Sequence, residues 1–168
     1  MHIAYRVNVN PEDCVHVRRI VQSSSFFSAE EVEVAEELVN ERLEHGERSG
    51  YHFMFADTCK MPVGYTCFGR IPGTACSFDL YWIAVLEGFR GRGVGRELFL
   101  RTEALIIRMG GCRLYTETSS RPHYESTRAF YEHNGFKGEA VLEDFYAFGD
   151  GKVIYTKKLE RGLQDHTG

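Results

Sequence analysis

Residues 80–111 read LYWIAVLEGFRGRGVGRELFLRTEALIIRMGG, and this stretch decides the fold. Its first seven residues are apolar or aromatic, which predicts a buried strand. A turn rich in glycine and arginine follows at residues 88–95. Apolar side chains then recur at helical spacing up to Met109, and Gly110 and Gly111 end the predicted helix. The stretch therefore predicts a strand, a glycine turn and a helix in succession.

This order of elements suits a bound anion. The first turn of a helix presents N–H groups without intrahelical acceptors, and the helix dipole adds partial positive charge there. Arg90, Arg92 and Arg96 add charged, fork-shaped donors that match phosphate oxygens. The turn is therefore predicted to bind a phosphate or pyrophosphate. The alternative is a glycine-rich connection whose arginines are merely solvated.

The spacing of the glycines distinguishes between phosphate motifs. The dinucleotide fingerprint requires a glycine where this chain has Arg96, and the turn lacks the Gly-Lys-Ser/Thr ending of a P-loop. The pattern Arg90-x-x-Gly93-x-Gly95 instead resembles the Arg/Gln-x-x-Gly-x-Gly/Ala signature of the Gcn5-related N-acetyltransferase (GNAT) family. In that family this loop holds the pyrophosphate of acetyl-CoA.

A second motif lies at residues 126–136 and predicts a helix that ends at a glycine, with Phe136 folding back onto it. It resembles the GNAT pattern Asn-x-x-Ala-x-x-(Phe/Leu)-Tyr-x-x-x-Gly-Phe. In the family the tyrosine lies beside the CoA sulfur and can protonate the leaving thiolate, a role that the resemblance assigns to Tyr131. From the residues alone, the preferred interpretation of Tyr131 is a core aromatic whose hydroxyl bonds to backbone. Ser126 replaces the family's frequent Asn, and its shorter side chain weakens the implied contact with the pantetheine arm or the phosphates.

The resemblance implies an acetyl-CoA site, and the scattered histidines offer no metal-ligand spacing, so no metal is predicted. In this family the backbone of the strand before the loop pairs with the pantetheine arm like an added strand. That position corresponds here to Ile83, Ala84 and Val85. The implied pyrophosphate contacts come from Arg90, Gly91, Arg92, Gly93, Val94, Gly95 and Arg96.

The transfer of an acetyl group to an amine requires a general base. An amine with a pKa near that of lysine, ~10, is mostly protonated at neutral pH. GNAT members place Glu or His at the strand positions of Asp79 and Tyr81, and alternation predicts that both share one face with Ile83. Glu117, on the next predicted strand, is the rival candidate. Either carboxylate is also explained as an ordinary exposed residue near a strand end.

The rest of the chain predicts further elements around this core motif. Strands are predicted at residues 2–9, 51–56, 61–69, 76–86, 112–118, 136–141 and 152–159. Helices are predicted to begin near residue 10, at a capping box of Ser28 and Glu31, after the glycine turn and at residue 122. Residues 144–151 are predicted to form a loop.

The order β-α-α-β-β-β-α-β-α-β-β matches the order typical of the GNAT family. The resemblance therefore implies an α/β (α+β) fold: a mixed, mostly antiparallel central sheet with a splayed parallel pair and helices on both faces. We expect one N-acetyltransferase domain at residues 1–160, followed by a polar tail at 161–168.

The net charge, the apolar segments and the cysteines limit the kinds of partner and the cellular compartment that we expect. The net charge of −4 gives no reason to expect nucleic acid, and no segment predicts a membrane span or secretory signal. The five cysteines are an odd number without a C-x-x-C pair. This argues against a disulfide framework or a zinc site and favours a reducing, cytoplasmic location, with all five as small core or surface residues. The sequence neither predicts nor excludes a homodimer.

The sequence thus predicts an acetyl-CoA-dependent enzyme that transfers the acetyl group directly to a primary amine of a small molecule or peptide. The alternative is a non-catalytic acyl-CoA-binding or sensing module on the same fold. Tyr131 favours the enzyme, because a sensor needs no proton donor for a thiol. Aromatic residues in the 51–68 hairpin and at 145–148 predict an aromatic acceptor side but do not identify the amine.

Overall fold

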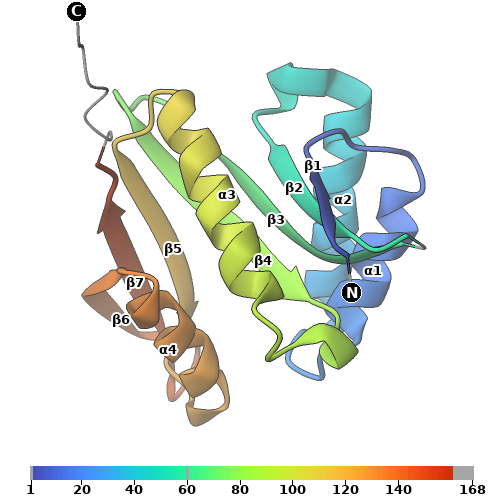
Figure 1. Cartoon of the computed structure of the whole chain (residues 1–168). Coiled ribbons are helices and arrows are strands. Elements are labelled where there is room, and N and C mark those ends of the chain that lie inside the picture. Colours follow the sequence, from blue (N-terminus) through green and yellow to red (C-terminus); the bar gives the residue numbers. More distant parts are fainter. Residues whose placement is uncertain (1, 60, 161–168) are drawn as a thin grey trace, which may run out of the picture. The chain divides into compact units, whose positions relative to one another are not determined.

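The computed structural model describes residues 2–59 and 61–160 (Figure 1). The strands are β1 Ala4–Arg6, β2 His52–Asp57, β3 Pro62–Arg70, β4 Ser77–Val85, β5 Arg113–Ser119, β6 Lys137–Ala147 and β7 Asp150–Lys158. The α-helices are α1 Asp13–Gln22, α2 Ala29–His45, α3 Val94–Arg108 and α4 Glu125–His133, and the short 3₁₀ helices are η1 Gly46–Ser49, η2 Glu87–Phe89 and η3 Pro122–Tyr124. The predicted order of strands and α-helices is confirmed.

The strands form a seven-stranded sheet in the order β1-β2-β3-β4-β5-β7-β6. β4 and β5 are parallel and are joined through α3, whereas β1–β2, β2–β3, β5–β7 and β6–β7 are antiparallel. This mixed, mostly antiparallel sheet is the predicted class. The chain divides into two compact units, one holding residues up to 69 with 80–102, and the other holding 70–79 with the residues from 103 onward. Both β4 and α3 run through the division.

In the first unit, α1 and α2 cover one face of β2 and β3. Alternate residues of each strand point to this face, and those in the core are apolar or aromatic. The buried cluster comprises Val17, Ile20, Val21, Val32, Ala35, Val39, Phe53, Phe55, Tyr65, Cys67 and Ala84. The predicted capping box forms: Ser28 Oγ accepts from the Glu31 N–H, and the Glu31 carboxylate accepts from the Ser28 N–H.

The other face of β3 lies against the first part of α3. A Cβ at Gly64 would lie 2.9 Å from Leu98 Cδ1 and 3.1 Å from the Ala84 carbonyl oxygen, so only glycine allows this approach. The hydroxyls of Thr66 and Thr102 form a buried hydrogen bond of 2.7 Å between the strand and the helix. β3 is therefore covered on both faces, which explains why eight of its nine residues are buried.

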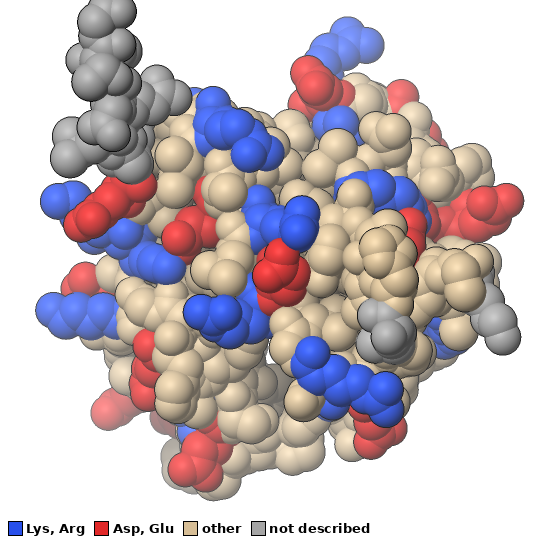
Figure 2. All heavy atoms as spheres, in the orientation of Figure 1, with Lys and Arg blue, Asp and Glu red and all other residues tan. Residues whose placement is uncertain are grey.

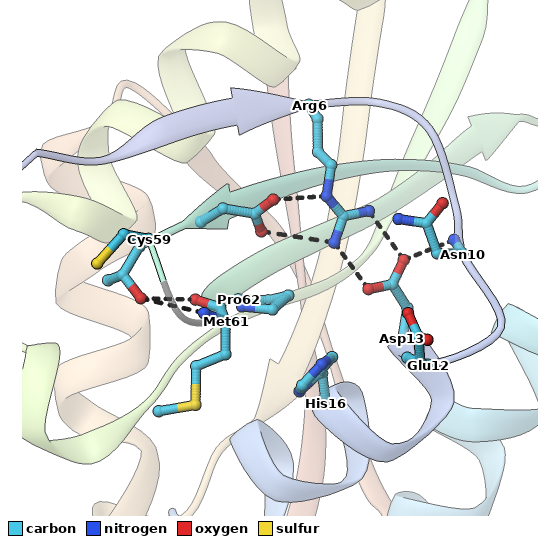
Figure 3. Close-up of a pocket in the computed structure, with 10 residues that line it drawn as sticks. Arg6, Asn10, Glu12, Asp13, His16, Cys59, Met61 and Pro62 are labelled. Carbon is cyan, nitrogen blue, oxygen red and sulfur yellow. Dashed lines mark hydrogen bonds and ion pairs between the residues drawn. The ribbon is translucent and has the colours of Figure 1, made fainter.

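A polar network ties β1 to the start of α1 and the end of β2 (Figure 3). The Arg6 guanidinium donates to both oxygens of Asp13, at 2.8 and 2.7 Å, and its Nε donates to Asp57 at 2.6 Å. Asp13 is 1% exposed and also accepts from the Asn10 N–H at 2.7 Å. These groups line an open polar pocket, but their donors and acceptors satisfy one another, so we assign them a structural role.

In the second unit, α4 lies on the face of β5 and β7 that carries Thr116 and Tyr155. Tyr131 of α4 packs against Phe136 and Tyr155, with ring centroids 5.4 and 5.7 Å apart. The Tyr155 hydroxyl donates to the Glu132 carboxylate at 3.0 Å. Burial and this carboxylate raise the pKa of Tyr155 to about 12.

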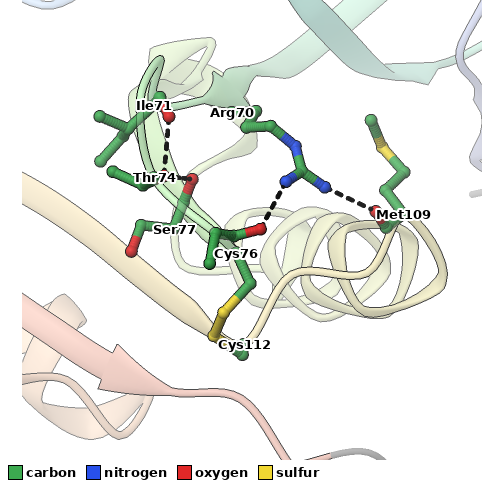
Figure 4. Close-up of a disulfide and its surroundings, with 8 residues drawn as sticks. Arg70, Ile71, Thr74, Cys76, Ser77, Met109 and Cys112 are labelled. Atoms are coloured by element: carbon green, nitrogen blue, oxygen red, sulfur yellow. Dashed lines mark hydrogen bonds between the residues drawn. A yellow bond between two sulfur atoms is a disulfide. The ribbon is translucent and has the colours of Figure 1, made fainter.

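A disulfide between Cys76 and Cys112 contradicts the expectation that all five cysteines are unpaired (Figure 4). Their Cα atoms lie 5.3 Å apart, and the Cys112 N–H donates to the Cys76 carbonyl at 2.9 Å. The two residues directly precede the parallel pairing of Ser77 with Arg113, so strand register brings them together across 36 positions of sequence. The odd count arises because the other three cysteines are free.

β6 is longer than predicted and includes residues 144–147, which were expected to form a loop. Asp144 adopts a left-handed backbone conformation with a φ of +52°, and the pairing with β7 is irregular between Leu142 and Ala147. The Asp144 carboxylate accepts from the Gly149 N–H at 2.7 Å and closes the turn to β7. These irregular residues interrupt the alternation of apolar and polar side chains, so the sequence pattern did not predict this part of the strand.

Basic and acidic side chains are interspersed over the face of the molecule shown in Figure 2. In the described part of the chain, none of the helices has the length and apolar character needed to cross a membrane.

Candidate active site

The glycine turn positions the N-terminus of α3. Gly91 and Gly93 have φ values of +69° and +80°, which side chains strongly disfavour. The N–H of Glu97 donates to the Gly93 carbonyl at 3.0 Å and makes the first helical hydrogen bond. The N–H groups of Val94, Gly95 and Arg96 therefore precede the helical ladder and are available to an anion at this end.

The arginines of this turn differ in what they contact. The Nε of Arg90 donates to the Val85 carbonyl at 3.0 Å, and the Arg90 guanidinium lies 5.7 Å from the ring centroid of Phe26. Arg90 thus ties the turn back to the end of β4. Arg92 lies 5.7 Å from the ring centroid of Phe89, and both Arg92 and Arg96 are exposed. The structure therefore gives Arg90 an anchoring contact in addition to its predicted role.

The last residues of β4 point alternately to the two faces. Ala84 belongs to the cluster with α1 and α2, whereas Val85 lies beside Gly64 on the side of α3. By alternation Ile83 shares the face of Val85. The backbone of these three residues, predicted to receive the pantetheine arm, thus lies in the strand directly before the turn.

Tyr81 departs from the predicted pattern. Its ring contacts Tyr51 at a centroid distance of 5.5 Å, and the following Trp82 contacts Phe27 at 5.0 Å. Both Tyr51 and Trp82 pack against the cluster of α1 and α2, so two consecutive β4 side chains lie on that side. The alternation breaks at this point, and the prediction that Tyr81 shares a face with Ile83 is wrong.

Tyr131 is held with its hydroxyl near β5. The residue is 6% exposed, and its hydroxyl forms a hydrogen bond with the Thr116 side chain. Burial raises the pKa of Tyr131, and the bond with Thr116 only partly offsets this rise. Tyr131 is therefore protonated at neutral pH, as a proton donor must be. Ser126 lies exposed in the first turn of α4, five residues before Tyr131.

The two candidate bases lie on neighbouring strands of the second unit. Asp79 is in register with Tyr115, and Glu117 follows two residues later on the same face of β5. Burial and, to a smaller extent, the negative charge of Glu117 raise the pKa of Asp79. Glu117 itself is paired with Lys152 at 2.9 Å, and its side chain is 55% exposed. The environment of Asp79 thus makes it a stronger base than an ordinary aspartate.

Comparison with known proteins identifies the family. A family model for the acetyltransferase (GNAT) domain matches residues 49–138. A crystal structure described as a GNAT-family acetyltransferase from Desulfovibrio desulfuricans is 45% identical in sequence. The superposition covers 95% of this chain and 100% of the chain in that structure, with a TM-score of 0.93. The chain belongs to the GNAT family of acetyltransferases.

Two more distant structures share the GNAT fold. PaiA N-acetyltransferase from Thermoplasma acidophilum, crystallised with coenzyme A, is 20% identical over 94% of this chain and 99% of its own, with a TM-score of 0.71. Aminoglycoside 6'-N-acetyltransferase from Enterococcus faecium is 17% identical over 96% of this chain and 98% of its own, with a TM-score of 0.72. No curated protein matches the chain. Acetyl-CoA, the predicted co-substrate, fits the GNAT assignment.

The sequence did not predict the partners of two predicted site residues, Tyr131 and Glu117. Thr116 contacts Tyr131 because α4 packs on β5, and Lys152 contacts Glu117 because β7 pairs with β5. Neither contact joins residues that are near in the sequence. The family motifs do not include either position, so the only available signal was alternation along two strands whose register was unknown. Among the described residues, no group of three or more His, Cys, Asp or Glu side chains is arranged to hold a metal ion.

Proposed function

We propose that this GNAT-family chain is an N-acetyltransferase that moves the acetyl group of acetyl-CoA directly onto a primary amine of a small molecule or peptide. The observation that carries the proposal is Tyr131, which corresponds to the tyrosine of the second GNAT motif and has its hydroxyl buried and bonded to Thr116, whereas a binding-only module needs no proton donor for a thiol. A neutral amine attacks the thioester carbonyl, an oxyanion forms, and CoA leaves as a thiol once its sulfur receives a proton.

The glycine turn supports the cofactor half of this proposal. The N–H groups at the start of α3 suit the pyrophosphate, and a Cβ built at Gly91 or Gly93 would meet no atom within 4 Å. A side chain at either position would therefore project into open space beside the turn. The β4–β5 ladder comprises three residue pairs, at Ser77–Asp79 and Arg113–Tyr115, which is consistent with later β4 backbone serving the pantetheine arm.

The proton steps are divided between two groups. Asp79 removes the proton of the attacking amine, directly or through water, because its raised pKa makes it a stronger base than an ordinary aspartate. Tyr131 donates a proton to the departing thiolate. Free cysteine nucleophiles have no part in this scheme, since the amine attacks the thioester itself.

The decisive experiment incubates the purified protein with acetyl-CoA and a panel of primary amines and measures release of the CoA thiol. The panel includes small aliphatic and aromatic amines and short peptides with free N-termini. We expect amine-dependent thiol release together with an acetylated product of the matching mass. Tight acetyl-CoA binding without thiol release over the whole panel would instead favour the sensing module and contradict the enzyme.

A further inference from the structure

The ammonium group of Lys152 is held on three sides in the second unit. It pairs with Glu117 Oε1 at 2.9 Å and lies 3.7 Å from the ring centroid of Phe145 and 5.8 Å from that of Tyr146. The two rings stand nearly perpendicular, at 85°, with centroids 5.0 Å apart. The Lys152 side chain is only 13% exposed. One carboxylate and two aromatic faces thus fix a single charge in place.

We infer that Lys152 is a positioning residue for the proposed reaction: it fixes the Glu117 carboxylate and offsets the negative charge that Glu117 presents to Asp79. The inference rests on the proposed function, in which Asp79 is the general base. It adds a residue of β7 that neither family motif contains.

Strand register supports the inference. Asp79 pairs with Tyr115, Glu117 pairs with Ile154, and Lys152 lies two residues before Ile154 on the same face of β7. The three charges therefore follow one another across β4, β5 and β7. Among the described strands of the second unit, the other ionisable side chains on this face include Arg113, Tyr115, Lys158, Lys137 and Asp150. Asp150 accepts from the Ser119 hydroxyl and pairs with Arg121 at 3.3 Å. Among these groups, Glu117 is the one whose charge raises the pKa of Asp79.

The sign of the effect follows from electrostatics. Without Lys152, the charge of Glu117 is no longer balanced, and the Asp79 carboxylate becomes harder to ionise. The pKa of Asp79 then rises further, so at any given pH on the acidic limb a larger fraction of the enzyme carries a protonated, inactive base. The rings of Phe145 and Tyr146 keep the ammonium beside Glu117 rather than free in solvent.

The test compares Lys152→Met with Lys152→Arg and with the control Lys157→Met. Lys157 lies on the same strand but faces the other side, where it pairs with Glu103. For Lys152→Met we expect the acidic limb of the kcat/KM profile to move up by about 0.5–1 pH unit, with a rate loss of ~3–10-fold below that limb. Lys152→Arg should restore most of the parent profile, and Lys157→Met should leave the limb in place.

A second readout separates this inference from the proposed function. NMR titration of the carboxyl carbon of Asp79 reports its pKa without any turnover. Lys152→Met should raise that pKa in the parent background but not in a Glu117→Gln background, because Glu117 transmits the effect. If Asp79→Asn retains full activity, the proposed base is wrong, yet the NMR shift still tests the role of Lys152. An unchanged Asp79 titration in Lys152→Met, or an equal shift in Lys157→Met, would overturn the inference.

Discussion

At the scale of single residues, the proposed function divides the proton transfers between two side chains, and their environments differ in the required way. Tyr131 is buried, protonated and bonded to Thr116. Asp79 is half-buried beside Glu117, which makes it a base with a raised pKa. Acyl transfer to an amine needs a group that donates a proton to the thiolate and a base that takes a proton from the amine. The environments of Tyr131 and Asp79 suit these two roles.

Tyr131→Phe tests the proton donor. The ring contacts with Phe136 and Tyr155 remain, so fold and acetyl-CoA affinity should change little. The turnover number should fall by ~10²–10⁴-fold, the usual worth of a positioned general acid, and kcat should fall more than KM changes. Thiols are good leaving groups, so we expect the low end of this range. Melting temperature, CoA affinity and kcat together decide the matter. A structural tyrosine would give a lower melting temperature and near-normal turnover.

Asp79→Asn tests the base and gives opposite signs for stability and activity. Because the pKa of Asp79 is raised in the folded state, its ionisation disfavours folding, and stability falls as pH rises through the unfolded and then the folded pKa. The variant should therefore be at least as stable as the parent at pH 7. Its rate should fall at neutral pH and recover partly at high pH, where the amine deprotonates itself. A parallel Glu117→Gln variant that lost more rate would transfer the role of base to Glu117.

At the scale of elements, the turn between β4 and α3 and the start of α1 show how the chain positions backbone groups. The first uses left-handed glycines to aim the N–H groups of a helix. The second uses a buried carboxylate, Asp13, to fix the start of a helix against a strand. Both depend on a few residues whose replacement should have a defined effect.

Gly93→Val should abolish acetyl-CoA binding. A branched side chain disfavours the φ of +80° and would fill the open space beside the turn. Gly73→Val is the matched control, because Gly73 has a φ of +76° in a turn that carries no predicted cofactor contact. Both variants should lose some stability, but only Gly93→Val should lose the rise in melting temperature that acetyl-CoA produces in the parent. Equal CoA affinity in Gly93→Val and the parent would refute the loop assignment.

Asp13→Asn should destabilise the fold without altering the chemistry. Asp13 is almost fully buried and accepts three hydrogen bonds, two from Arg6 and one from the Asn10 N–H. We expect a loss of about 2–4 kcal/mol, typical of removing one partner of a buried ion pair. Asp57→Asn should cost less, since Asp57 is more exposed and Arg6 keeps Asp13. Chemical denaturation measures both, and a larger loss in Asp57→Asn would contradict this ranking.

At the scale of the whole molecule, the Cys76–Cys112 disulfide encloses the whole stretch at residues 80–111 that decides the fold. The closed loop contains β4, the glycine turn and α3. A covalent link at the start of both parallel strands limits how far the unfolded chain can spread between them. The link therefore stabilises the strand–turn–helix motif on which the proposed cofactor site depends.

Reduction of this disulfide should lower stability measurably. The chain-entropy model gives about 4 kcal/mol for a loop of this length. The parent should unfold at lower denaturant concentration when a reductant is present, whereas a Cys76→Ser, Cys112→Ser double variant should not respond to the reductant. Cys14→Ser, at a free cysteine, should keep the response. A parent insensitive to reductant would show that the bond contributes little.

The sequence by itself determined the element order, the glycine turn and the position of Tyr131. These features are local: a turn needs particular residues at particular steps, and a helix repeats its apolar side chains every three or four residues. The two family motifs then indicated the function class, because each consists of particular residues at fixed spacing within a short segment. The edge strand β6 was partly missed because irregular residues at 142–147 interrupt its alternation.

Only the tertiary structure decided which distant residues meet. Strand register pairs Cys76 with Cys112 and brings Lys152 to Glu117, and the packing of α4 on β5 gives Tyr131 its partner Thr116. A shift of one residue in pairing turns every side chain of a strand to the opposite face, so such contacts do not follow from the residues of one strand. The break at Tyr81 has the same origin, because its neighbours belong to elements far away in the sequence.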